Sequence, residues 1–219
     1  MSEAPIVIGL VGGAGSGRDR AAAVMARFGF CSLALAEAMR IEISQAWRVD
    51  RRILSDRAHK ERPLPELAVA MCTDQAFVRR AVDQQHDLLQ PRSPRWAMQH
   101  WGTNFRRAQN PAYWVRVVEA LAWRQLDAGS RRIVISDVRL HNEAELVRRL
   151  GGTLLRVHGS AQSPIDADAR RHVSESQWGE IQVDDGIRNE GAPIGLEQEV
   201  EDMLLRMFPA IQPVEVIKR

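Results

Sequence analysis

The sequence contains little cysteine and has no long uncharged apolar run. Its two cysteines, Cys31 and Cys72, have no metal-ligand spacing, and a disulfide scaffold is excluded for a chain of this length. A membrane-spanning helix needs about 20 apolar residues, and no stretch approaches that length. The first residues carry no positive charge ahead of the apolar run, so a secretory signal is not predicted. We therefore expect a cytoplasmic protein, in the host cytoplasm if the gene is viral, with no membrane partner.

Lysine is also scarce, although basic residues as a class are not. The 30 basic residues include only Lys60 and Lys218 as lysines, so 28 are arginines. Arginine presents a planar fork of donors suited to phosphate, but an excess of arginine also arises from coding bias. Only arginines that lie inside motifs therefore count as functional candidates. The net charge of +2 is too small for a protein that coats nucleic acid, and no nucleic-acid partner is expected.

The 219 residues, 45% of them hydrophobic, suffice for one domain or for a domain with an insertion. Apolar runs predict strands at Ile6–Val11, Arg132–Asp137 and Thr153–Val157, and a short one at Ile181–Val183. Helical patterns occupy Arg18–Phe28, Ala34–Val49, Pro65–Asp87, Arg95–Trp101, Ala112–Asp127, Glu143–Leu150 and Leu196–Phe208. Asp50–Leu67 is predicted as a loop, and Trp47, Trp101 and Trp123 as core. Alternating strands and helices predict an α/β fold with a mainly parallel sheet.

A glycine-rich segment, Gly12–Asp19, lies between the first strand and the first helix. Glycines let successive backbone N–H groups turn toward an anion, and the helix N-terminus adds positive partial charge. Gly12 and Gly17 fit the pattern G-x-x-x-x-G-K-[ST], whereas Arg18 replaces the lysine and Asp19 the hydroxyl residue. Arg18 keeps the positive charge on a bulkier group. The segment is predicted to bind phosphate; the alternative is a turn that only tightens the junction.

A second candidate lies where the strand Arg132–Asp137 ends. Functional groups of parallel α/β sheets gather at the carboxyl ends of strands. Asp137 there is suited to hold Mg²⁺ directly or through water, and Arg139 to meet a phosphate. The alternative is a helix N-cap followed by a surface arginine. Two such strand ends in one chain favour a nucleotide-handling enzyme.

Several strings resemble motifs of the phage-type deoxynucleoside monophosphate kinases, in that family's order. Arg95–Asn104 followed by Tyr113–Val115 resembles R-x-x-M-Q-x-x-G-T-[DN] and Y-W-V. Asp137–Glu143 is similar to D-x-R-x-x-[NH]-E, and His172–Glu175 to the lid motif H-[VI]-[ST]-E. Ile187–Gly191, with Leu196 and Glu197 after it, resembles I-x-N-D-G-[ST]-L-E-E-L. The family also carries aspartate at the position of Asp19.

The resemblance implies a P-loop NTPase-like three-layer sandwich, similar to adenylate kinase, as one domain over residues 1–219. Residues 34–128 would form a helical nucleoside-monophosphate-binding region and residues 159–178 a short lid. The implied reaction is ATP-dependent phosphorylation of a deoxynucleoside monophosphate (dNMP) to the diphosphate with Mg²⁺, by a homodimer. Other P-loop kinases, of the phosphomevalonate or dephospho-coenzyme A type, remain alternatives, as does a nucleotide-binding protein weakened by Arg18.

The resemblance also assigns roles to individual residues. ATP contacts are implied for Gly12, Gly13, Gly15, Ser16, Gly17, Arg18, Asp19 and Asn189. Substrate contacts are implied for Arg40, Arg95, Gln99, Gly102, Thr103, Trp114, Asp137, Arg139, Glu143 and Glu175. The implied catalytic residues are Arg18, Asp19, Arg139 and the lid arginines Arg170 and Arg171, and the implied Mg²⁺ ligands are Asp19 and Asp137. Arg18 and Arg40 stand where the family has lysine, and Ala14 where a basic residue can occur.

Overall fold

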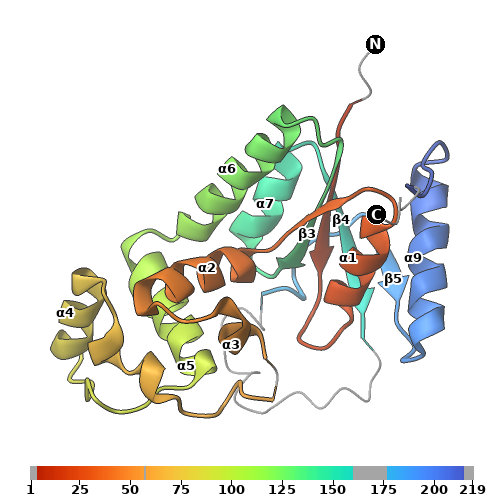
Figure 1. The fold of residues 1–219 in the computed structure, drawn as a ribbon. Helices are drawn as coiled ribbons and strands as arrows, with labels where there is room; N and C mark the ends of the chain where they lie inside the picture. Colours follow the sequence, from red (N-terminus) through yellow and green to blue (C-terminus); the bar gives the residue numbers. More distant parts are fainter. Residues whose placement is uncertain (1–3, 57, 160–176, 215–219) are drawn as a thin grey trace. The chain divides into compact units, whose positions relative to one another are not determined.

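The chain divides into two compact units, which we describe separately (Figure 1). The computed structural model describes residues 4–56, 58–159 and 177–214. One unit comprises Met1–Leu35 and Val118–Arg219, and the other comprises Ala36–Val117. Within the described ranges, no helix is both long enough and apolar enough to cross a membrane.

A five-stranded sheet forms the centre of the first unit. Its strands are β1 (Ile6–Val11), β2 (Cys31–Leu33), β3 (Arg132–Val138), β4 (Thr153–His158) and β5 (Asp185–Arg188). They lie in the order β2-β3-β1-β4-β5, and every neighbouring pair is parallel. All the strands therefore point their carboxyl ends to the same edge of the sheet. This arrangement confirms the predicted α/β class with a parallel sheet.

Helices cover both faces of this sheet (Figure 1). On one side, α1 (Arg18–Ala26) and α9 (Pro193–Met207) bury Met25, Val200 and Leu204 in a core that includes Ile8 and Leu10 of β1. On the other side lies α7 (His141–Arg149). A Cβ atom placed on Gly9 of β1 would lie 2.6 Å from Val147 of α7, so only glycine allows this close packing. Because side chains alternate along a strand, the two helix layers bind opposite sides of β1 and complete a three-layer sandwich.

The second unit is helical. Its helices are α2 (Leu35–Trp47), α3 (Arg51–Ser55), α4 (Gln75–Asp83), α5 (Pro94–Gln99) and the start of α6 (Tyr113–Asp127), with 3₁₀ turns η1 (Pro65–Leu67) and η2 (Val69–Met71). After α5 the chain continues as η3 (His100–Arg107), an eight-residue π-helix. The core is aromatic: the rings of Trp47, Phe77, Trp101 and Phe105 contact one another with centroids 5.1 to 5.4 Å apart.

The structure corrects several predicted elements. The predicted strand Ile181–Val183 is wrong: the Ile181 carbonyl accepts a 2.6 Å hydrogen bond from the Arg156 side chain, and the strand begins only at Asp185. The predicted loop after Val49 contains α3, because Asp50 caps it by accepting from the Arg52 N–H at 2.8 Å.

Two elements of the structure are not predicted, and one tryptophan that is predicted in the core is exposed. Neither β2 nor the π-helix is predicted from the sequence. Trp47 and Trp101 are core residues as predicted, but Trp123 is 52% exposed. Trp123 follows Ala122 on α6, whose buried positions, Trp114, Val115, Val118 and Ala122, recur every three to four residues. The next position therefore faces away from the buried stripe.

Candidate functional site

The glycine-rich loop between β1 and α1 has a conformation that requires glycine. Gly15 and Gly17 have φ angles of 77° and 102°, in the left-handed region that side chains disfavour. A Cβ atom on Gly12 would lie 2.8 Å from the carbonyl oxygen of Val157, at the end of β4. The loop is therefore folded tightly against the carboxyl edge of the sheet, directly before a helix N-terminus.

The loop presents hydrogen-bonding groups that an anion would satisfy. Ser16 is 5% exposed, and its Oγ has no hydrogen-bond partner in the described part of the chain. Gly17, at the N-cap of the nine-residue α1, provides no side-chain cap for the first N–H groups of the helix. Buried polar atoms without partners are rare in folded proteins, and helix N-termini attract anions. The residues present therefore fit the phosphate groups that the sequence predicts for this loop.

Arg18 lies between the loop and the end of β3. Only 7% of this residue is exposed, and its Nη1 lies 3.5 Å from the carbonyl oxygen of Val138. The placement follows from the sheet register, since Val11 of β1 and Val138 of β3 are parallel partners. The structure thus brings the cation of the loop to the second strand end that the sequence singles out. Asp19, beside it in the first turn of α1, is exposed.

The residues at the end of β3 are held mainly by backbone groups. Asp137 Oδ1 accepts a 2.8 Å hydrogen bond from the N–H of Leu35. Glu143 is 3% exposed, and its Oε2 accepts from the N–H groups of Arg139 at 2.8 Å and Leu140 at 3.1 Å. Glu143 therefore caps the start of α7 and fixes the backbone of Arg139. The alternative interpretation of Asp137 as a helix N-cap is wrong, because the N-cap residue of α7 is Leu140. Contacts of these residues with substrate stay a prediction.

Asn189 contacts the glycine-rich loop itself. Its Nδ2 donates a 2.8 Å hydrogen bond to the carbonyl oxygen of Ser16, and its backbone N–H donates to His158 at 2.9 Å. A Cβ atom on Gly17 would lie 2.6 Å from this Nδ2, so glycine is needed there for a second reason. Asn189 thus links the loop to the end of β4. The contact with adenine that the resemblance implies is a separate prediction.

Trp178 is a residue at the loop that sequence reasoning missed. A Cβ atom on Gly13 would lie 3.1 Å from its indole ring. Arg156 Nη2 donates to three carbonyl oxygens of the same segment, those of Trp178, Gly179 and Ile181, with the shortest distance 2.6 Å to Ile181. Nothing in the spacing of residues 156 to 181 signals this packing, because it depends on a side chain that crosses to a neighbouring segment.

In the helical unit, the two arginines assigned to the substrate are paired with carboxylates. Arg40 Nη1 lies 3.0 Å from Glu37 Oε2, and the other oxygen of Glu37 lies 2.9 Å from Arg51. Arg95 forms an ion pair with Glu61. The Nε of Arg40 is buried and has no hydrogen-bond partner within the described residues. A phosphate that bound Arg40 would therefore compete with Glu37.

The other substrate candidates of this unit lie on α5, η3 and α6. Trp114 is 1% exposed and donates its indole N–H to the carbonyl oxygen of Gly102 at 3.1 Å, so the structure brings these two together as packing partners. A Cβ atom on Gly102 would lie 2.4 Å from Met39. Gln99 is exposed and Thr103 half-buried. The lid candidates Arg170, Arg171 and Glu175 lie outside the described residues.

The described residues contain no cluster of three or more metal-ligating side chains. Mg²⁺ is commonly bound by one or two carboxylates together with substrate phosphates and water. Asp19 and Asp137 are a donor set of that kind. They lie at the helix start and at the strand end that border Arg18.

Comparison with known proteins supports the fold and no finer assignment. No protein-family model matches the chain, and no curated protein matches it. Among solved structures, TT1252 from Thermus thermophilus matches with a TM-score of 0.52 at 18% identity, over 94% of this chain and 99% of that chain. An unliganded sugar kinase from Janibacter sp. HTCC2649 matches with a TM-score of 0.43 at 17% identity, over 97% of this chain and 100% of that chain, too distant to support an argument. The architecture is a three-layer sandwich around a five-stranded parallel sheet, and the likeness to TT1252 concerns this fold alone.

Proposed function

We propose that this protein is an ATP-dependent kinase that phosphorylates deoxynucleoside monophosphates to diphosphates. The observation that carries the proposal is the loop at residues 12–17, which has left-handed glycines and is followed by the buried cation Arg18. Its buried Ser16 hydroxyl has no hydrogen-bond partner among the residues that the structure describes. The substrate class rests on the resemblance of Arg95–Asn104 and Asp137–Glu143 to motifs of phage-type deoxynucleoside monophosphate kinases.

Phosphoryl transfer needs alignment and charge neutralisation more than covalent chemistry. The segment Gly12–Asp19 would wrap the β-phosphate of ATP with its backbone N–H groups, and Arg18 would supply the cation for the β- and γ-phosphates. Asp19 and Asp137 are the candidate ligands of Mg²⁺, which offsets the charge that develops on the transferred group. Arg139, whose backbone Glu143 fixes, binds phosphate from the end of β3.

The helical unit supplies the acceptor side of the reaction. Arg40 and Arg95 bind the monophosphate by exchanging their carboxylate partners, Glu37 and Glu61, for phosphate oxygens. Gln99 and Thr103 contact the nucleoside, with Gly102 and Trp114 supporting them. Arg170, Arg171 and Glu175 are proposed as lid residues that exclude water from the reaction, on the resemblance alone. A homodimer is proposed on the same ground.

A coupled ADP-release assay with MgATP and each of dAMP, dGMP, dCMP and dTMP tests the proposal. Phosphomevalonate and dephospho-coenzyme A serve as control acceptors. Release with one or more dNMPs is the expected result and names the accepted bases. Release only with a control acceptor would assign the chain to another P-loop kinase class.

A second candidate function is a nucleotide-binding protein with weakened catalysis, which the replacement of the loop lysine by Arg18 favours. It predicts that MgATP binds, in a calorimetric titration, while every acceptor stays unphosphorylated. The variant Arg18→Lys then tests whether Arg18 is the reason for weak catalysis. Restoring the usual lysine would raise turnover above background only if Arg18 causes the loss of activity.

A further inference from the structure

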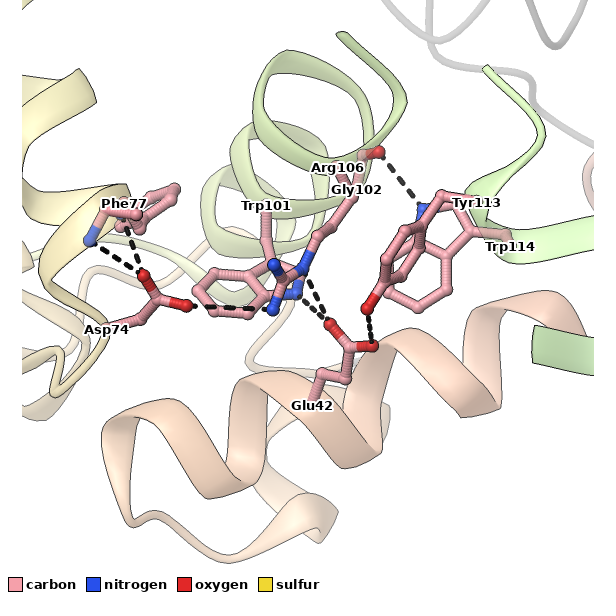
Figure 2. Close-up of polar contacts among 9 residues, drawn as sticks. Glu42, Asp74, Phe77, Trp101, Gly102, Arg106, Tyr113 and Trp114 are labelled. Atoms are coloured by element: carbon pink, nitrogen blue, oxygen red, sulfur yellow. Dashed lines mark hydrogen bonds and ion pairs between the residues drawn. The ribbon is translucent and has the colours of Figure 1, made fainter. Parts of the chain in front are cut away.

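One carboxylate in the helical unit collects donors from three residues on two other helices (Figure 2). Glu42, on α2, accepts hydrogen bonds from Trp101 Nε1 at 3.0 Å and Arg106 Nε at 2.9 Å, both on one oxygen. Its other oxygen accepts from the hydroxyl of Tyr113 at 2.6 Å. Trp101 and Arg106 belong to the π-helix η3 and Tyr113 begins α6. Glu42 therefore ties both of these helices to α2.

The ion pair in this network is partly shielded from water. The side chains of Glu42 and Arg106 are each 21% exposed. The Arg106 guanidinium also lies 3.6 Å from Asp74, which caps α4, and packs over the rings of Trp101 and Tyr113 at 4.7 and 5.1 Å. Removing one partner of such a pair leaves the other charge poorly compensated, so the arrangement depends strongly on Glu42.

The helix that Glu42 holds has an uncommon geometry. π-Helices are rare and mostly short, and they occur frequently at functional sites. Within the eight residues of η3 lie Gly102 and Thr103, two of the residues that the resemblance assigns to the substrate. The Gly102 carbonyl oxygen accepts from Trp114 on α6, so η3 is held from two sides, by Glu42 through side chains and by Trp114 through the backbone.

We infer that Glu42 is a positioning residue, whose carboxylate holds η3 in the conformation that binds the dNMP. This inference rests on the proposed function and refines it: Glu42 sets the affinity for the acceptor nucleotide and leaves that for ATP unchanged. The contacts of Glu42 lie within Ala36–Val117, whereas the phosphate loop belongs to the other unit. Glu42 itself contacts neither the loop nor Arg18 through any of these bonds.

Tyr113 provides a direct spectroscopic readout of the network, because it is the only tyrosine in the sequence. Burial, together with the hydrogen bond to Glu42 and its negative charge, raises the pKa of Tyr113 to about 12. An amide in place of the Glu42 carboxylate removes the negative charge that opposes formation of the tyrosinate. A pH titration followed by tyrosinate absorbance, at an assay wavelength near 295 nm, then measures the pKa of Tyr113 and shows whether its hydrogen bond to Glu42 is lost.

The test compares Glu42→Gln with Glu119→Gln in the full-length protein. Glu119 also pairs with one arginine, Arg149 at 3.2 Å, and belongs to neither candidate site. We expect Glu42→Gln to raise KM for the dNMP about tenfold or more, as the loss of charge-assisted hydrogen bonds does, with KM for ATP within about twofold of the wild type. The tyrosine pKa should fall in the same variant. Glu119→Gln should leave KM for the dNMP, KM for ATP and the pKa of Tyr113 unchanged.

A fall in kcat with an unchanged KM for the dNMP, or equal changes in both KM values, would overturn the inference. If Glu42→Gln does not fold, Tyr113→Phe replaces it. This variant removes one of the three bonds and should raise KM for the dNMP about two- to fivefold, again without a change for ATP; an unchanged value overturns the inference. A wild type that neither phosphorylates nor binds any dNMP by calorimetry overturns the proposed function as well. If the wild type phosphorylates a dNMP and the variants show the same KM values as the wild type, the inference about Glu42 is overturned and the proposed function stands.

Discussion

The two compact units hold their candidate site residues by different means. In the unit with the sheet, backbone groups form the site: left-handed glycines shape the loop, and main-chain groups bond to Asp137, Glu143 and Asn189. In Ala36–Val117, side chains do this through the Glu42 network and the aromatic cluster around Trp101. In this backbone-held site glycines set the shape of the loop, so Arg18 can be truncated without changing that shape, whereas the side-chain-held site of Ala36–Val117 depends on each member of the Glu42 network.

The largest expected effect is at Arg18, the charged member of the backbone-held site. Arg18→Ala should lower kcat/KM about 10³-fold, because charge stabilisation in phosphoryl transfer is lost while the loop keeps its shape. Steady-state kinetics measures the loss, and circular dichroism should show an unchanged fold. Near-normal turnover would remove Arg18 from the mechanism.

Trp101→Ala tests the side-chain-held unit. Trp101 is 1% exposed and packs against Trp47, Phe77 and Phe105. Its truncation should cost about 3–5 kcal/mol of unfolding free energy, measured by urea denaturation. MgATP affinity, measured by calorimetry at low temperature, should persist because the loop lies in the other unit. Trp123→Ala, on the exposed face of α6, is the matched control and should change stability little.

Asn189→Ala tests whether the loop of the backbone-held site needs a side-chain contact in addition to its glycines. The variant removes the 2.8 Å hydrogen bond to the Ser16 carbonyl oxygen, which should weaken MgATP binding about fivefold to tenfold. KM for the dNMP should stay as in the wild type. Glu190→Gln, at the exposed neighbouring position, serves as the control. An unchanged Kd for MgATP would show that the loop keeps its shape without Asn189.

The smallest expected effect concerns pH. Burial lowers the pKa of His100, aided by the nearby charges of His86 and Arg92 and opposed by the hydrogen bond to the Trp96 carbonyl oxygen. The folded state therefore binds this proton less readily than the unfolded chain, so stability is full above the unfolded pKa of about 6.5 and falls as pH drops below it. His100→Phe, which keeps a ring against Trp96, should flatten this acid decline in denaturation curves recorded from pH 7 to pH 5. An unchanged slope would assign the decline to other groups.

The sequence predicts the sheet unit better than the helical one, for a physical reason. Strands such as Ile6–Val11 and the loop that follows are encoded by local residue types, since burial demands apolar residues and positive φ demands glycine. The π-helix and the hydrogen bonds of Glu42 arise from side chains 59 to 71 positions away, for which no local pattern exists. Asn189 and Trp178 at the loop are long-range in the same sense, so their contacts also escape sequence reasoning.

The residues that contact the glycine-rich loop, residues 12–17, also determine when during synthesis this loop can take its final conformation. Residues 12–17 leave the ribosome before their neighbours Val157, Trp178 and Asn189, which lie about 140 to 180 positions further along the chain. Ala36–Val117 is continuous in sequence and has its own aromatic core, so it is free to fold while the rest is being translated. Contacts of such wide sequence separation form slowly, so the conformation of this loop should be among the last features that the nascent chain acquires.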